Sequence, residues 1–321
     1  MRIIVHGVGA IGGVVAAALS LSGQEVIGIA RGGMLDAIRA KGLLLDSERG
    51  HEVARFPCVG HPNEIKFRED DAVLLCVKGQ DTAGALADLR SAGLNRQPVF
   101  CCQNGVANEP LALRFFPNVH AVTVMMPASY LEPGEVAIHC QPSFGIFDLG
   151  RFPSGHDEAD LAMAAALERA NIPTLVRDDA MAPKYGKLLL NLGNITGALL
   201  PHGADCKPFD DPLREEGKAV LAAAGIGWAD VGDTERRRIH MKDREKAAQG
   251  RGGNSTVQSL ARGTGSVETD YLNGEIVALA RTCGVEAPLN ERIQLLSVEL
   301  MARGGQPESL TEDQLQEKLF G

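Results

Sequence analysis

The sequence opens on an apolar run that is followed at once by three regularly spaced glycines. Residues 2–6 (Arg-Ile-Ile-Val-His) predict a buried parallel strand, and the alanine-rich run after the glycines predicts a helix that Gly23 ends. Between them, Gly7, Gly9 and Gly12 form the pattern Gly-x-Gly-x-x-Gly. The first glycine allows a tight turn, the second lets the backbone approach a pyrophosphate, and the third lets the helix pack close to the strand. This order predicts a dinucleotide-binding unit.

The first turn of that helix supplies further contacts to such a ligand. Backbone N–H groups at a helix start have no intrahelical acceptor, so they attract anions. A glycine-rich turn with no ligand is the alternative, but a second strand at residues 25–30 lies where a dinucleotide-binding unit requires it. The predicted cofactor contacts in this loop are Gly7, Gly9, Ala10, Ile11 and Gly12.

The residue after the second strand indicates which dinucleotide is bound. NAD sites place an acidic residue there for the ribose 2′-hydroxyl, whereas NADP sites use an arginine for the 2′-phosphate. This chain has Arg31, then Gly32 and Gly33, and no acidic residue before Asp36. We therefore predict NADP as the cofactor, with a solvated arginine at a strand end as the alternative.

Composition favours a cytoplasmic enzyme without a metal. The 321 residues are 45% hydrophobic, enough to bury a sizeable core in two domains, and the net charge of −9 argues against nucleic acid as the main partner. We expect no secretory signal, because the chain begins directly with a strand, and no membrane span, because no apolar run approaches about 20 residues. The seven cysteines form no Cys-x-x-Cys pair, so free thiols are expected and no metal site is predicted.

The predicted secondary structure changes near residue 179. Residues 1–179 alternate strand and helix, with an inserted hairpin near residues 43–55 and β-rich segments at 119–148 that we expect to extend the sheet. Residues 180–321 show helical patterns only. The predicted fold is therefore α/β: an N-terminal Rossmann-like, doubly wound sheet (1–179) that binds NADP, and a C-terminal all-helical domain (180–321) for substrate and catalysis.

Polar residues follow two of the predicted strands. Lys78 comes directly after the apolar run 71–77, and Asn104 follows the run 99–102. Ligands of doubly wound sheets bind outside the carboxyl ends of the strands, so both residues are expected to face the cofactor. The pair Asn104-Gly105 could equally be a simple turn.

The helical part opens on a polar face within an apolar stretch. Lys187, Asn191 and Asn194 follow one another at i, i+4 and i+7, which places them on one side of a helix rich in leucine. An exposed polar stripe is the plain alternative. A further stretch, residues 267–275, could by itself be an ordinary acidic turn.

Together these motifs resemble the ketopantoate reductase (2-dehydropantoate 2-reductase) family. The resemblance rests on the glycine loop, Arg31, Val77-Lys78, Gln103-Asn104-Gly105, Lys187-Leu-Leu-Leu-Asn191 and Glu268-Thr-Asp-Tyr-Leu-Asn-Gly274, in that order across almost the whole chain. It implies reduction of ketopantoate to pantoate with NADPH, on the route to pantothenate and coenzyme A.

The resemblance also implies residue roles. Lys187 is expected to be the general acid and Glu268 to hold the substrate hydroxyl, so these two are the predicted catalytic residues. Asn104 is expected beside both nicotinamide and substrate, and Asn191 is expected to support the site. A general acid suits the chemistry, because hydride transfer to a ketone leaves an alkoxide that needs a proton.

Two departures from the family pattern concern substrate recognition. The family's next substrate-binding Asn falls at position 195, where this chain has Ile195, with Asn194 one residue early. The family's carboxylate-binding serine corresponds to Ser255 or Thr256. The predicted substrate contacts are therefore Asn104, Asn191, Asn194, Ser255 and Thr256, and the partner is a small 2-oxo acid that could differ from ketopantoate.

Two interpretations from other classes remain open. A non-catalytic NADP-sensing protein would not need Lys187 and Glu268 together. The Arg-rich stretch 235–251 could bind nucleic acid, but acidic residues interrupt it and its spacing suits a solvated helix. We expect a monomer or homodimer.

Overall fold

The computed structural model describes residues 1–244, 256–257, 260, 268–304 and 306–321. The chain divides into two compact units: Met1–Lys184 with Asp230–Arg251, and Tyr185–Ala229 with Gly252–Gly321. The sequence suggested a single boundary after residue 179. By its contacts the chain instead leaves the first unit after Lys184, returns to it at Asp230 and leaves it again after Arg251.

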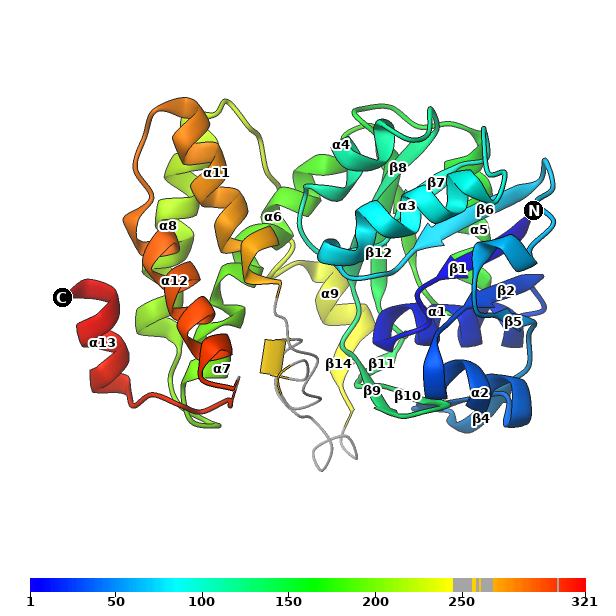
Figure 1. The fold of residues 1–321 in the computed structure, drawn as a ribbon, viewed down its shortest axis with the longest axis horizontal. Coiled ribbons are helices and arrows are strands. Elements are labelled where there is room, and N and C mark those ends of the chain that lie inside the picture. The colour runs from blue at the N-terminus through cyan, green and yellow to red at the C-terminus, as the bar shows by residue number, and fades with distance from the viewer. Residues whose placement is uncertain (245–255, 258–259, 261–267, 305) are drawn as a thin grey trace. The chain divides into compact units, whose positions relative to one another are not determined.

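The first unit is built on an eight-stranded sheet in the order β13-β12-β8-β7-β6-β1-β2-β5 (Figure 1). Its neighbours are parallel except for the antiparallel pair β8 and β12. The strands are β1 (Arg2–His6), β2 (Val26–Ile29), β5 (Cys58–Val59), β6 (Asp71–Leu75), β7 (Val99–Cys101), β8 (Val119–Met125), β12 (Ile146–Arg151) and β13 (Thr174–Val176).

Helices cover both faces of this sheet, as the prediction of a doubly wound fold requires. Side chains alternate across β1, so Ile3 and Val5 pack into the core on one face and Ile4 packs into the core on the other. The first core includes α1 and α5, and the second includes α3 and α4. The helices of this unit are α1 (Ala10–Leu21), α2 (Gly32–Lys41), α3 (Thr82–Ser91), α4 (Asn108–Leu113), α5 (Glu158–Arg169) and α9 (Glu235–His240), with 3₁₀ turns η1 (Pro62–Glu64) and η2 (Gly79–Asp81).

A second sheet packs against α1, in the order β4-β3-β10-β9. The expected hairpin near residues 43–55 is confirmed as the antiparallel pair β3 and β4. The expectation that all of 119–148 extends the main sheet is wrong in part, because only β8 and β12 join it. The strands of this second sheet are β3 (Leu43–Ser47), β4 (Gly50–Ala54), β9 (Ala128–Glu132) and β10 (Glu135–Ile138).

The segment after residue 230 belongs to the first unit because its arginines bond there. β14 (Met241–Asp243) pairs with β11 (Cys140–Pro142). Arg236 forms an ion pair with the buried Asp148 and donates to two carbonyl groups, and Arg244 donates to Asp46 at 2.7 Å. Arg236 and Arg244 are therefore used for internal contacts, while α9 (Glu235–His240) has no buried residue and Arg238 is exposed, as expected of a solvated helix.

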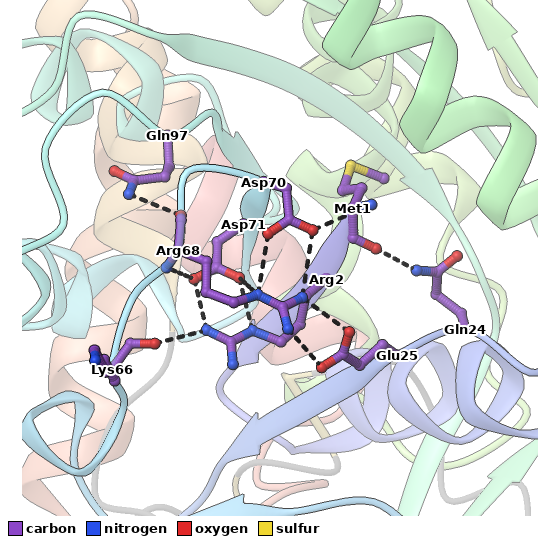
Figure 2. A network of polar contacts seen from close by, with 9 residues as sticks. All are labelled: Met1, Arg2, Gln24, Glu25, Lys66, Arg68, Asp70, Asp71 and Gln97. Atoms are coloured by element: carbon purple, nitrogen blue, oxygen red, sulfur yellow. Dashed lines mark hydrogen bonds and ion pairs between the residues drawn. The ribbon is translucent and has the colours of Figure 1, made fainter.

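The amino end of the main sheet is fixed by a network of ion pairs (Figure 2). Arg2 donates through Nε and Nη2 to the two carboxylate oxygens of Asp71 at 2.7 and 2.8 Å. The backbone N–H of Arg68 donates to the same carboxylate at 2.6 Å. Because Arg2 begins β1 and Asp71 begins β6, this network joins two neighbouring strands at their amino ends.

The second unit is helical. Its helices α8, α11 and α12 pack against one another (Figure 1). None of the helices in the described part of the chain combines the length and apolar character needed to cross a membrane. The elements are α6 (Met181–Asn191), which starts in the first unit, then η3 (Leu192–Asn194), α7 (Thr196–Leu199), α8 (Lys207–Ala223), η5 (Thr269–Tyr271), α11 (Asn273–Cys283), α12 (Pro288–Ala302) and α13 (Glu312–Phe320).

Candidate functional site

Two of the three motif glycines are required by close packing. Gly7 has a φ of +103°, and a Cβ there would lie 2.8 Å from the backbone N of Val77. A Cβ on Gly12 would collide with the carbonyl O of Gly7 and lie 2.9 Å from Cβ of Cys76. Only glycine therefore lets β1, the start of α1 and the end of β6 approach this closely.

Gly9 differs from its two neighbours in the motif. No heavy atom of the described residues lies within 4 Å of the position where its Cβ would stand. It caps α1, whose first turn holds no acidic side chain, so Ala10, Ile11 and Gly12 offer N–H groups without intrahelical acceptors. The open space and the positive end of the helix dipole together make this loop able to hold an anion such as a pyrophosphate.

Arg31 lies at the turn between β2 and α2. It is exposed and occupies the N-cap position of α2, with extended backbone (φ −129°, ψ 155°). Gly32 follows with a φ of +53°, and Gly32 and Gly33 are also exposed. A guanidinium beside two residues without side chains leaves room for a phosphate group.

His6 is the last residue of β1 and lies opposite Ile29, the last residue of β2. Its ring is buried, and no partner for Nδ1 occurs among the described residues. Burial is the main cause that lowers the pKa of His6 to about 4, and the positive charges of Arg31 and His61 lower it further while Asp88 acts in the opposite direction. The imidazole is therefore neutral at physiological pH.

This pKa predicts a pH dependence of stability. The unfolded chain protonates His6 near pH 6.5 and the folded chain only near pH 4, so folding is favoured at neutral pH and loses free energy as pH falls through that window. Between pH 7.5 and pH 5 the loss from this residue is about 2 kcal/mol. We expect His6→Leu to reduce the pH dependence by that amount, measured by urea unfolding at both pH values. An unchanged difference between the two pH values would contradict this assignment.

Buried hydrogen bonds tie the two strand ends that carry Lys78 and Asn104. Gln103 Nε2 donates to the carbonyl O of Val77 and to Thr82 Oγ1, both at 2.8 Å. Thr82 donates to Asn108 Oδ1 at 2.8 Å, and Asn108 Nδ2 donates to the carbonyl O of Asn104 at 3.1 Å. The loops after β6 and β7 are thus held as one piece at the carboxyl edge of the sheet. The sequence indicated Gln103 only as part of the motif Gln103-Asn104-Gly105, and it gave no signal for Thr82 or Asn108.

Lys78 and Asn104 themselves are both half-buried. Lys78 caps η2, three residues after the end of β6, and Gly105, beside Asn104, has a φ of +77°. The Asn-Gly pair thus turns the chain, and it does so at the end of β7, next to β6 in the sheet. A turn and a position at the ligand edge are compatible here.

In the second unit, α6 presents Lys187 and Asn191 one turn apart, and both are half-buried rather than exposed. α6 ends at Asn191 and Asn194 lies in the 3₁₀ turn η3, so the three residues do not share one continuous α-helix. The backbone of Gly193 packs directly on the carboxylate of Asp210, which leaves no room for a side chain there. The i+7 spacing of Asn194 and Lys187 assumes an α-helix throughout, whereas residues 192–194 form a 3₁₀ turn.

The second motif of this unit is held against that turn. Asn273 is buried and donates through Nδ2 to the carbonyl O of Leu192 at 3.1 Å and to Asn290 Oδ1 at 3.0 Å. Asp270 accepts from Gln294 Nε2 at 2.7 Å. Asn273 thus ties the segment that begins at the half-buried Glu268 to the turn that follows α6, and Asp270 ties it to α12.

The remaining substrate candidates lie before this motif. Thr256 is buried. Ser255 lies outside the described residues.

One cluster of possible metal ligands has a structural explanation. Asp157 and Asp160 form a capping box at the start of α5, where each carboxylate accepts from backbone N–H groups. Asp157 also pairs with Arg151, and His120 Nδ1 lies 2.8 Å from Asp160 Oδ1. These carboxylates are therefore engaged in fixing a helix end.

Comparisons with known proteins agree with this architecture. The family model "Ketopantoate reductase PanE/ApbA" matches residues 3–153, and the model "Ketopantoate reductase PanE/ApbA C terminal" matches residues 192–298. A 2-dehydropantoate 2-reductase of Pyrococcus horikoshii is 26% identical over 298 residues, which cover 90% of this chain and 94% of that protein.

Solved structures share the fold across nearly the whole chain. A PanE/ApbA family ketopantoate reductase from Ralstonia eutropha JMP134 aligns with a TM-score of 0.79 and 28% identity, covering 95% of this chain and 99% of that one. A D-mandelate dehydrogenase in a ternary structure with NADH and anilino(oxo)acetate aligns with a TM-score of 0.80, 22% identity and coverage of 95% and 99%. Because the two family matches together span well over half of its residues, the chain belongs to the ketopantoate reductase PanE/ApbA family.

Proposed function

We propose that this protein reduces 2-dehydropantoate (ketopantoate) to pantoate with NADPH. The observation that carries the proposal is the hydrogen bond from Asn273 to the carbonyl O of Leu192, which joins the motif of Glu268 to the turn that follows the helix of Lys187 and Asn191. The family membership and the names of relatives about 26% identical support the same reaction. As a biosynthetic enzyme it would act in the cytoplasm.

The residues of the first unit fit NADPH. The open space at Gly9 and the first turn of α1 suit the pyrophosphate, and the exposed Arg31 with its two glycines suits the 2′-phosphate. Lys78 and Asn104 at the strand ends complete the set of proposed contacts. When bound, NADPH supplies the hydride for the ketone carbon.

In the second unit, Lys187 is proposed to hold the proton that the reaction needs. Its ammonium stabilises the alkoxide that forms as the hydride arrives, donates a proton to that oxygen and is left as a neutral amine. Glu268 accepts a hydrogen bond from the substrate hydroxyl, and Asn191 supports the site. Ser255 or Thr256 would bind the substrate carboxylate.

Oxidation of NADPH, followed by absorbance with 2-dehydropantoate and a panel of other 2-oxo acids, tests the reaction. Turnover of 2-dehydropantoate with the highest kcat/KM supports the proposal. Ile195, where the family has asparagine, favours a second candidate, a reductase of another small 2-oxo acid, which a different best substrate would establish. Tight NADPH binding with no turnover would refute both and favour an NADP sensor.

Cofactor preference has its own test in Arg31→Ala. Because only NADPH offers a 2′-phosphate to the guanidinium, the variant is expected to weaken NADPH binding by roughly tenfold or more, the equivalent of a lost charge-assisted bond of about 1.5–3 kcal/mol. NADH binding should change by less than about twofold. Fluorescence titration with both cofactors measures this, and an equal loss for both would show that Arg31 does not read the phosphate.

A further inference from the structure

A buried ion pair connects α4 to the first turn of α6. Lys184 Nζ contacts Glu109 Oε1 and also donates to the carbonyl O of Cys101 at 3.2 Å. Only 2% of the Lys184 side chain and none of the Glu109 side chain is exposed. Both residues belong to the first unit, and Lys184 is its last residue before the chain enters the second.

In the first unit, the pair lies among segments close to the proposed cofactor contact Asn104. Cys101 ends β7, just before the loop that carries Asn104, and Glu109 follows Asn108, which holds the Asn104 backbone. On the other side, Lys184 lies three residues before Lys187 on the same helix. Because residues i and i+3 of a helix are neighbours on its surface, fixing Lys184 fixes the turn from which Lys187 extends.

Stability alone does not account for this pair. Burial raises the pKa of Glu109, and its Oε2 has no hydrogen-bond partner among the described residues. Replacing a buried ion pair with apolar side chains of similar volume is often neutral or stabilising, because the desolvation of two charges offsets their attraction. A pair with an unsatisfied oxygen is therefore an inefficient way to hold a core together.

The next turn of α6 also packs closely against neighbouring backbone. A Cβ on Gly186 would collide with the carbonyl O of Ala229, so the helix passes this backbone at contact distance. Two consecutive contacts, at Lys184 and at Gly186, thus leave the start of α6 little freedom to rotate or slide.

We propose that Lys184 and Glu109 are positioning residues, which fix the first turn of α6 on β7 and α4 so that Lys187 is presented in one orientation. The inference rests on the proposed function of Lys187 as proton donor. Apolar side chains of similar volume would fill the same space, but they would not fix the orientation of α6 as the ion pair does.

The test compares two buried pairs in the same unit. Lys184→Met/Glu109→Met removes both charges of the positioning pair at similar volume. Arg2→Met/Asp71→Asn removes the pair at the amino ends of β1 and β6, and the asparagine retains an acceptor for the N–H of Arg68 (Figure 2). Lys184→Arg keeps a cation opposite Glu109 and serves as the conservative variant.

For Lys184→Met/Glu109→Met we expect an unchanged or higher melting temperature, an unchanged NADPH Kd, and a kcat lower by on the order of ten- to a hundredfold, since small misplacements of a reacting group cost that much. The deuterium isotope effect from 4-deuterated NADPH should rise as hydride transfer becomes slower. Lys184→Arg should retain most of the kcat, and Arg2→Met/Asp71→Asn should retain it fully. A kcat near wild type in the first variant, or an equal loss in the Arg2/Asp71 control, would overturn the proposal.

Hydrogen exchange separates this proposal from the proposed function. If the wild-type protein turns over no 2-oxo acid, the proposed function fails, but the amides of residues 185–191 should still exchange faster in Lys184→Met/Glu109→Met than in the control. If these amides and those of the rest of the protein exchange in Lys184→Met/Glu109→Met at the wild-type rates, the ion pair does not fix α6 and the inference is wrong. If the first variant does not fold, the same comparison is made with Glu109→Gln, which removes one charge at similar volume: faster exchange of residues 185–191 is expected, and wild-type exchange contradicts the inference.

Discussion

Replacement of Lys187 by alanine is expected to lower kcat on the order of a hundredfold or more, the usual effect of a lost general acid. Because the proton and the developing charge concern only the transition state, NADPH affinity should stay nearly unchanged. Stopped-flow turnover and fluorescence titration of NADPH measure the two quantities. A solvated lysine would instead give kinetics within about twofold of wild type.

Glu268→Ala is the informative comparison for this prediction. A hydrogen bond to the substrate hydroxyl exists in both ground and transition states, so its loss should raise KM for the oxo acid as well as lower the rate. Near-normal turnover in a folded Lys187→Ala protein would remove the proposed mechanism.

The second large effect is expected from the glycine loop. In Gly12→Ala the new Cβ would collide with the Gly7 carbonyl, so α1 must move away from β1. We expect a loss of about 1–3 kcal/mol in unfolding free energy, typical of overpacking, together with weaker NADPH binding. Urea unfolding and cofactor titration measure both.

Gly9→Ala serves as its matched control. The site of the new Cβ is empty and the φ of Gly9 is negative (−101°), so the loss of stability should be smaller than in Gly12→Ala. NADPH affinity should nonetheless fall by roughly ten- to a hundredfold, because the methyl group enters the space proposed for the pyrophosphate at an overpacking cost of about 1–3 kcal/mol. Unchanged affinity in Gly9→Ala would mean that the pyrophosphate lies elsewhere.

Local patterns predicted the parts of this fold that depend on local chemistry. The β-branched run before Gly7, the alanine-rich run that Gly23 ends and the hairpin near residues 43–55 each depend on residues close together in the chain, and the elements they define are present. Ligand-edge positions such as Lys78 follow from the rule that parallel strands end at one edge.

Other features depend on contacts between residues far apart in the chain. The pairing of β11 with β14 joins segments about a hundred residues apart, and nothing in either short run specifies the other. The need for glycine at position 193 depends on the carboxylate of Asp210, which packs on its backbone. The same is true of Glu109, which meets Lys184 across 75 positions and has no sequence signature.

The return of the chain to the first unit after Ala229 limits how this protein can be divided. A fragment that ended at Lys184 would lack β14 and Arg236, leaving β11 with an unpaired edge and Asp148 buried without one of its cations. A chimaera of two family members with a single junction near residue 184 would therefore take its sheet from one parent and Arg236 from the other. Exchanges with two junctions, near residues 184 and 230, would keep Arg236 and Asp148 from the same parent.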